Sequence, residues 1–233
     1  MNFSKQEINA LIITTIIFSF IFSFTQWGPG KQADISIGLT NLLIGIFIVG
    51  ISLLAHHLAQ KWHATRLGFH AEQKMWWEGL IISLIFAIIT QGALTIFFGH
   101  GTFIEKTKKR LGTKRPNIDL YDYGRICLRG PMMNIFLGAT ILTMSWIFGL
   151  TTPLISKIFL FNISYAFWNL LPIPPLDGSR LFFASRLFYI FMISSYAAYI
   201  SLILFLNIFS FVYATIIGYI ILAMFYYFVE LNY

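Results

Sequence analysis

Long apolar runs separated by short polar segments dominate the sequence. A helix needs about 20 apolar residues to cross a bilayer, and runs near that length recur along the chain. The runs show neither the alternation of a half-buried strand nor the single apolar stripe of a water-facing helix. The pattern therefore predicts an all-α membrane protein. The predicted membrane segments are 8–25, 37–59, 80–98, 131–150, 153–171 and two within 181–229, with a break at Asn207.

The segment 80–98 is predicted to enter the membrane and return to the same side. Short loops rich in Lys and Arg favour the cytoplasmic side. If this segment is re-entrant and the N-terminus is cytoplasmic, only Lys31 and Lys157 of the 16 Lys and Arg residues lie outside. A crossing segment divides the basic residues less unevenly in either orientation. We therefore expect six transmembrane helices, both termini in the cytoplasm, and a turn of the re-entrant segment at Gln91 and Gly92.

The composition agrees with a membrane protein. Hydrophobic residues make up 58% of the chain and charged residues 11%, whereas about 25% of the residues in soluble domains are charged. Cys127 is the only cysteine, which excludes an internal disulfide and a cysteine-based zinc cluster. Residues 1–233 are predicted to form a single membrane domain with one polar insertion at 99–129.

Part of the net charge of +7 comes from the Lys and Arg residues in the run 105–116 of this insertion. A basic loop beside a membrane is expected to contact anionic lipid headgroups. An acidic partner or RNA is the alternative, but the run lacks the interleaved aromatic residues that bind single-stranded nucleic acid, so nucleic acid is not the expected partner.

Two polar clusters lie near predicted helix ends, and ionisable residues at membrane depth suggest function. The first contains His56, His57 and Gln60, and the second ends in Asp177 and Gly178. In the predicted orientation both clusters lie at cytoplasmic helix ends, so they are expected to meet in one pocket. The alternative for the histidines is that they have no functional role and lie at the membrane–water interface, where polar side-chain tips reach water. The isolated His70 and His100 are expected to be solvated.

Prolines are expected to unwind the chain before the second cluster. Pro172, Pro174 and Pro175 cannot continue a helix. Unwound backbone at membrane depth must be buried in protein or lie beside water. The unwinding is expected to deliver Asp177 to the pocket, with Gly178 permitting a tight turn.

Three sequence elements together resemble the site-2 protease family of intramembrane zinc metalloproteases over residues 37–186. The segment from Asn169 to Gly178, Asn-Leu-Leu-Pro-Ile-Pro-Pro-Leu-Asp-Gly, matches the second signature of that family. Gly130, Pro131 and Asn134 match the Gly-Pro-x-x-Asn that opens a core helix. The segment 55–61, Ala-His-His-Leu-Ala-Gln-Lys, stands where the family has His-Glu-x-x-His.

This resemblance implies a zinc site in a site-2-protease-like core. His56 and Asp177 match two metal ligands, Gln60 stands at the position of the second histidine, and His57 stands at that of the glutamate that activates water. A glutamine amide is a poor ligand beside imidazole, so zinc binding is expected to be weak or absent. The resemblance also implies contacts with the substrate or within the core for Asn134, Asn169, Pro172 and Gly178.

His63 is the obvious candidate among the other histidines to complete the site. It lies seven residues after His56, about 10.5 Å along a helix, so the helix would have to unwind near Lys61 for both to bind one ion.

An altered first motif beside a nearly complete second motif favours a non-proteolytic relative of this family that binds a partner's transmembrane segment. Two alternatives stay open. One is an active intramembrane zinc metalloprotease with a substituted site. The other is a structural subunit of a membrane complex that docks through the basic insertion.

Overall fold

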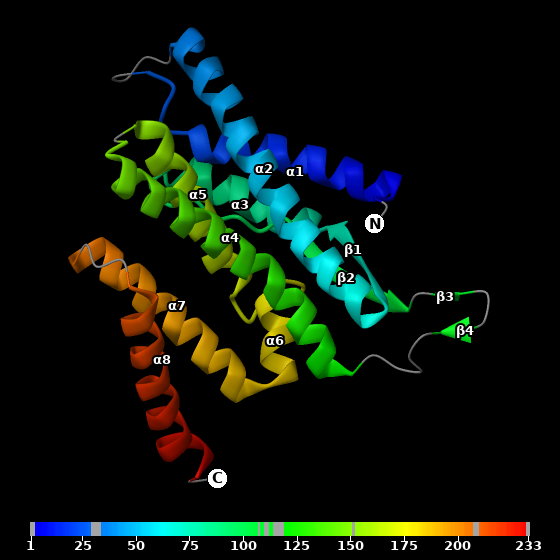
Figure 1. The fold of residues 1–233 in the computed structure, drawn as a ribbon. Coiled ribbons are helices and arrows are strands. Elements are labelled where there is room, and N and C mark those ends of the chain that lie inside the picture. The colour runs from blue at the N-terminus through cyan, green and yellow to red at the C-terminus, as the bar shows by residue number, and fades with distance from the viewer. Residues whose placement is uncertain are drawn as a thin grey trace.

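The computed structural model describes residues 3–28, 34–106, 108–109, 112–113, 119–150, 152–206 and 210–231, and helices dominate it (Figure 1). The helices are α1 (Lys5–Ser23), α2 (Ile35–Leu67), α3 (Trp77–Ile89), α4 (Leu120–Phe148), α5 (Pro153–Asn169), α6 (Asp177–Ala184), α7 (Arg186–Leu206), α8 (Phe211–Phe225) and the π-helix η1 (Tyr226–Glu230). The strands are β1 (Phe69–Met75), β2 (His100–Lys106), β3 (Lys108–Lys109) and β4 (Gly112–Thr113).

Five helices of the described chain are long and apolar enough to cross a membrane, which supports the predicted integral membrane class. They are α1, α2, α4, α7 and α8 continued by η1. Their outer surfaces carry exposed apolar side chains such as Phe47 and Trp146, as expected for surfaces that face lipid. The remaining predicted span, 153–171, corresponds to α5. This helix has 17 residues, which is the lower limit for crossing a bilayer.

The helix break predicted in the last apolar stretch lies between α7, which ends at Leu206, and α8, which begins at Phe211. Asn207 itself lies outside the described residues.

Helix α2 is longer than the predicted span 37–59. It begins after Asp34, whose carboxylate accepts hydrogen bonds from the backbone of Ser36 and Ile37, and ends at Gly68 in the left-handed conformation (φ 87°). A helix of 33 residues extends about 50 Å, well beyond the apolar thickness of a bilayer. The polar histidine segment therefore continues the same helix, and no unwinding near Lys61 brings His63 closer to His56.

A buried ion pair holds α1 against the polar half of α2. Lys61 Nζ lies 2.7 Å from Glu7 Oε2, and the two side chains are 2% and 1% exposed. The other Glu7 oxygen accepts a hydrogen bond from the backbone of Gln73 in β1. Helix α1, helix α2 and strand β1 are thus joined at one end of the molecule.

The segment between β1 and β2 reverses direction, as predicted for a re-entrant segment. The two strands pair antiparallel, with Met75 opposite His100, so the chain comes back to the point where it left. Helix α3 leads away from the end of β1, and an extended stretch leads back to the start of β2. The turn lies at the predicted pair, where Gln91 has φ 51° and Gly92 has φ 78°.

The predicted polar insertion 99–129 is only partly a loop. Its first residues form β2, and its last ten belong to α4, which begins eleven residues before the predicted start at Pro131. Helix α4 begins early because the Asp119 carboxylate caps it by accepting a hydrogen bond from the backbone N–H of Asp122. Pro131 lies inside this helix instead of starting it. The side chains of 106–118 lie outside the described set, so the expected lipid contact of 105–116 stays a prediction.

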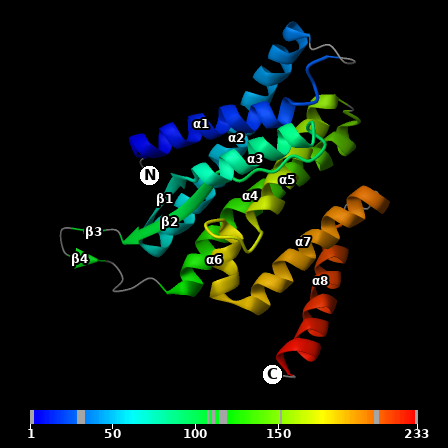
Figure 2. The ribbon, with the colours of Figure 1, turned by 180° about the vertical axis from the view of Figure 1, so that it is seen from behind.

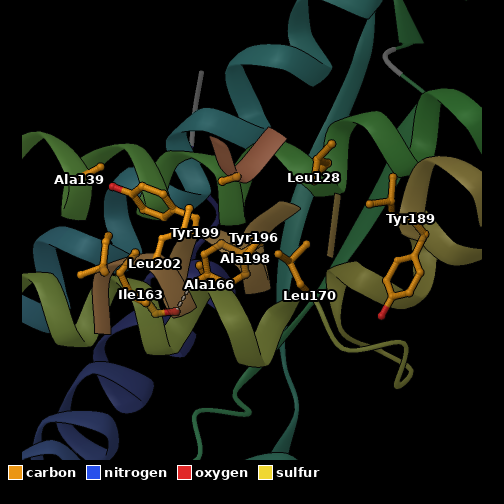
Figure 3. Packing of buried hydrophobic residues seen from close by; sticks show 13 residues of the cluster. Leu128, Ala139, Ile163, Ala166, Leu170, Tyr189, Tyr196, Ala198, Tyr199 and Leu202 are labelled. Atoms are coloured by element: carbon orange, nitrogen blue, oxygen red, sulfur yellow. Dashed lines mark hydrogen bonds between the residues drawn. The ribbon is translucent and has the colours of Figure 1, made fainter. Parts of the chain in front are cut away.

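Two apolar clusters flank the polar region. One joins α1, α2, α3 and α5 and is centred on aromatic residues such as Phe18, Phe161 and Tyr165. The other joins α4, α5, α6 and α7, as Figure 3 shows, and here the Tyr196 hydroxyl donates a hydrogen bond to the backbone oxygen of Ile163. Seen from behind, α7 and α8 form a pair on one side of the molecule, and α1 to α3 lie on the other (Figure 2).

Candidate functional site

The two polar clusters meet, as predicted, at His56 and Asp177. His56 Nε2 lies 3.0 Å from Asp177 Oδ2, and His56 Nδ1 lies 2.7 Å from Asn134 Oδ1. The Asn134 amide nitrogen donates to Ser52 O and Asn162 Oδ1, so its oxygen faces the histidine and Nδ1 must be the donor.

Asp177 accepts two further hydrogen bonds. Gln60 Nε2 lies 2.8 Å from Oδ2, and Thr102 Oγ1 lies 2.7 Å from Oδ1. With His56, three side chains from α2 and β2 surround a carboxyl group that is only 4% exposed. This network satisfies a buried polar group with contacts from the protein itself.

The orientation of the Gln60 amide is set by its neighbours. Its nitrogen also donates to the backbone oxygen of Cys127, at 2.9 Å, and its oxygen accepts from Gln73. The Cys127 oxygen is available because the residue four positions later is Pro131, which has no N–H to close the helical hydrogen bond. The proline inside α4 thus has a local consequence, which is to expose an acceptor for Gln60.

Two glycines allow the close approaches that the site requires. A Cβ at Gly130 would lie 2.2 Å from His56 Nε2, and a Cβ at Gly178 would lie 2.0 Å from the backbone oxygen of Leu170. Gly178 lies within α6 with ordinary helical geometry, so the tight turn predicted for it was wrong. Its lack of a side chain lets α6 pack directly on the unwound end of α5.

The other residues implied by the resemblance are scattered. Helix α5 ends at Asn169, as the prolines predicted, and the Asn169 amide bonds the Tyr165 oxygen one turn earlier. Pro172 is exposed in the turn between α5 and α6. Asn134 is fully buried and bonded at both ends, so in this structure it orients His56.

His57 lies beside this network, and its ring is nearly perpendicular to two other imidazole rings. Its centroid lies 5.7 Å from that of His56 and 4.8 Å from that of His100. His100 was expected to be solvated, but this is wrong: it is 4% exposed, because it begins β2 where the returning segment is packed beneath α1. Burial lowers the pKa of His100 to about 4, so its ring is neutral at pH 7.

Sequence reasoning missed Thr102, Gln73 and Gly130 as parts of the site. Thr102 and Gln73 lie on strands within segments read as polar connections, and only the pairing of β1 with β2 brings them to Gln60. Gly130 was visible as part of the Gly-Pro pair, but its closeness to His56 depends on how α2 crosses α4.

The side chains at this centre do not fit the zinc site that the resemblance implies. Zinc requires lone pairs from three protein ligands, and the third position presents the Gln60 N–H₂ group, which only donates. Within the described part of the chain, no group of three or more His, Cys, Asp or Glu side chains is arranged to hold a metal ion. His56 and Asp177 are brought together, but the ligand set is incomplete.

The fold and this centre define an integral membrane protein with a buried polar site between helix ends. The chain is 29% identical over 183 residues to a protein of Methanocaldococcus jannaschii named "Putative zinc metalloprotease", and the alignment covers 77% of this chain and 84% of that protein. No protein-family model matches the chain. No solved structure matches it. The similarity supports a metalloprotease-like membrane protein, in agreement with the broader class that the sequence motifs predicted.

Gly130→Ala is expected to displace the His56 ring, because the new methyl group would overlap it. Overpacking of this kind costs about 1–3 kcal/mol, whereas the nearest atom to a Cβ at Gly138, on the same helix, is an ordinary 3.4 Å away. Thermal unfolding in detergent should therefore show a lower midpoint for Gly130→Ala than for Gly138→Ala. Equal midpoints would contradict the close approach of α2 and α4 at His56.

Proposed function

We propose that this chain is a site-2-protease-like membrane protein that has lost the family's zinc-dependent hydrolysis and binds a transmembrane segment of a partner. The observation that carries the proposal is the Gln60 amide nitrogen at 2.8 Å from Asp177. A hydrogen-bond donor occupies the position where the family mechanism needs a metal ligand. The carboxylate is satisfied by neighbouring side chains.

The position of the family's catalytic glutamate supports the same conclusion. His57 stands there, and its ring packs against the rings of His56 and His100. A group that activates water must lie within hydrogen-bond reach of the proton it removes. His57 and Gln60, which stand at the positions of the family's glutamate and second histidine, are thus not arranged for hydrolysis.

A cavity of about 350 Å³ beside the returning segment is the proposed place for the partner. It lies between that segment, α5 and α7, and its lining is almost entirely apolar. Trp168 closes one side and donates a hydrogen bond to the Thr95 backbone oxygen. An apolar helix or extended segment that enters from the bilayer would meet apolar side chains here. The lining includes Ala93, Leu94, Phe159, Leu160, Ser164 and Ile200.

Site-specific crosslinking tests the proposal. A photoreactive amino acid is placed at Leu160, which lines the cavity, or at Trp146, a similarly exposed residue of α4 that does not. The expected result is an adduct with a membrane partner from Leu160 but not from Trp146. Ser164→Trp, which fills the cavity, should abolish the adduct, and the partner should be recovered at full length.

Each other outcome has a defined meaning. Equal adducts from both positions would show contact with bulk membrane proteins and contradict a cavity-specific partner. A partner recovered in shortened form would contradict the loss of proteolysis. It would favour the second candidate function, a metalloprotease with a substituted site, which the name of the Methanocaldococcus jannaschii protein supports.

We further propose that both termini and the basic insertion face the cytoplasm. Ser4 bonds Glu72 of β1, and Arg186 pairs with Glu230, so the chain ends approach β1 and the start of α7, respectively. The insertion follows β2 at the same end as β1. Its basic run 105–116 would then contact anionic lipid or, if the chain is a subunit of a complex, an acidic partner.

A further inference from the structure

The polar halves of α2 and α4 run side by side in opposite directions (Figure 1). Two contacts fix their alignment. Gly130 lies directly against the His56 ring, and one turn later on α2 the Gln60 amide donates to the backbone oxygen of Cys127, nearer the start of α4. The last turns of α2 therefore lie beside the first turns of α4.

Three arginines and a histidine gather where these turns meet. His63 and Arg66 are three residues apart on α2, and Arg125 and Arg129 are four residues apart on α4, so each pair shares one face of its helix. All three guanidinium groups lie within electrostatic range of the His63 ring. We call Arg66, Arg125 and Arg129 the arginine cluster.

The arginine cluster carries positive charge that the protein does not neutralise. None of its three guanidinium groups forms an ion pair or a hydrogen bond within the described part of the chain. Among the described groups within range of the His63 ring, Asp122 supplies the one negative charge. His63 is 9% exposed, and its buried Nε2 has no hydrogen-bond partner among the described atoms. Such a site is suited to an anion with several acceptor oxygens.

Two exposed aromatic rings indicate that the cluster lies at the membrane–water boundary. The guanidinium carbon of Arg66 lies 4.0 Å from the ring centroid of Trp62, and that of Arg125 lies 5.6 Å from the ring centroid of Tyr121. Trp and Tyr are enriched at this boundary. An arginine that stacks on an aromatic face keeps its in-plane N–H groups available for a phosphate.

Exposed apolar side chains continue from the cluster toward the middle of the membrane. On α4, Met132 and Phe136 follow Arg129 by three and seven residues and share its face. On α2, Leu58 precedes Trp62 by four residues, and both side chains are exposed. A free phosphate would leave these apolar surfaces uncovered, whereas the acyl chains of a lipid would lie along them.

We propose that Arg66, Arg125 and Arg129 bind the phosphate of an anionic phospholipid, whose acyl chains lie over the exposed apolar side chains of α2 and α4. Guanidinium groups bind phosphate oxygens in pairs, and basic pockets between membrane helices suit anionic headgroups. This site is separate from the basic run 105–116 and from the cavity beside α5. The inference goes beyond the partner-binding proposal, because it requires neither a partner segment nor hydrolysis.

Binding of short-chain lipids to the full chain tests this site. Protein purified in non-ionic detergent is titrated with dihexanoyl phosphatidylglycerol, dihexanoyl phosphatidylcholine or glycerol phosphate, and bound ligand is counted by native mass spectrometry. The expected result is one phosphatidylglycerol, bound at least about tenfold more tightly than the other two ligands. Arg125→Gln and Arg129→Gln should each weaken this binding by about tenfold, because each removes a charge-assisted hydrogen bond.

Two control variants remove positive charge elsewhere. Arg186→Gln changes an exposed arginine at the start of α7, and the double variant Lys108→Gln with Lys109→Gln changes the basic run. Both should leave the affinity within about twofold of the parent. If Arg129→Gln lowers the midpoint of thermal unfolding, Arg66→Gln tests the same site at an exposed position.

Two results would overturn the proposal. Equal weakening by the cluster variants and the control variants would show that net charge alone attracts the lipid. Binding of glycerol phosphate as tightly as phosphatidylglycerol would show a site for free phosphate and contradict a lipid. Neither result would affect the partner-binding proposal, which depends on the cavity beside α5.

Discussion

Combining Gln60→His with His57→Glu is expected to raise the affinity of the chain for zinc by at least about 100-fold. The first change places an imidazole one helical turn after His56, on the face that meets Asp177, and removes the amide donor. The second restores a carboxylate at the position of the water-activating glutamate. Competition titration with a chromophoric chelator measures the change.

Asp177→Asn is the control for this experiment. The gain must vanish when this change is added, because the aspartate supplies the third ligand. An affinity that does not rise would mean that residue 60 cannot turn its side chain toward the position between His56 and Asp177. The presence of Gln60 in place of the family's second histidine would then not explain the lost zinc site.

Gly178→Ala is expected to lower the free energy of unfolding by about 3 kcal/mol or more. The new Cβ would lie 2.0 Å from the Leu170 backbone oxygen, and a backbone atom cannot swing aside as a side chain can. Helix α6 would have to move away from the end of α5 and carry Asp177 with it. Reversible unfolding in a detergent and denaturant series gives the difference.

Gly50→Ala is the matched control, since its nearest neighbour would be an ordinary 3.6 Å away and it lies within a long helix. This control should be neutral or slightly stabilising, because alanine favours helix over glycine by about 1 kcal/mol. If Gly178→Ala proved as stable as Gly50→Ala, the direct packing of α6 on the unwound chain would be wrong.

Much of the fold was predictable because it depends on local rules. Apolar runs of membrane length predicted the long helices, and the prolines predicted the end of α5 near Asn169. The turn at Gln91 and Gly92 was predictable because left-handed backbone favours glycine and tolerates few other residues. The meeting of His56 with Asp177 followed from placing both motifs at one membrane face.

Other features could not be predicted from local patterns. The first helical turns of α4 were read as part of a polar loop, because membrane hydropathy does not detect a polar helical extension outside the apolar span. The strands β1 and β2 were missed for a related reason: their stability depends on pairing across 24 residues of intervening chain, which a local window cannot detect. His100 was misjudged because its burial depends on that pairing.

By itself, the sequence determined the membrane class, the long helices, the chain reversal and the meeting of His56 with Asp177. These features follow from residue chemistry and helical spacing, which act over short distances. Only the tertiary structure decided that Gln60 turns its N–H₂ group to Asp177, that Pro131 exposes the Cys127 oxygen to it, and that His57 faces His100. Those contacts depend on how α2 crosses α4 and β2, because a hydrogen bond or a ring contact requires positions set within a few tenths of an ångström by packing between distant segments.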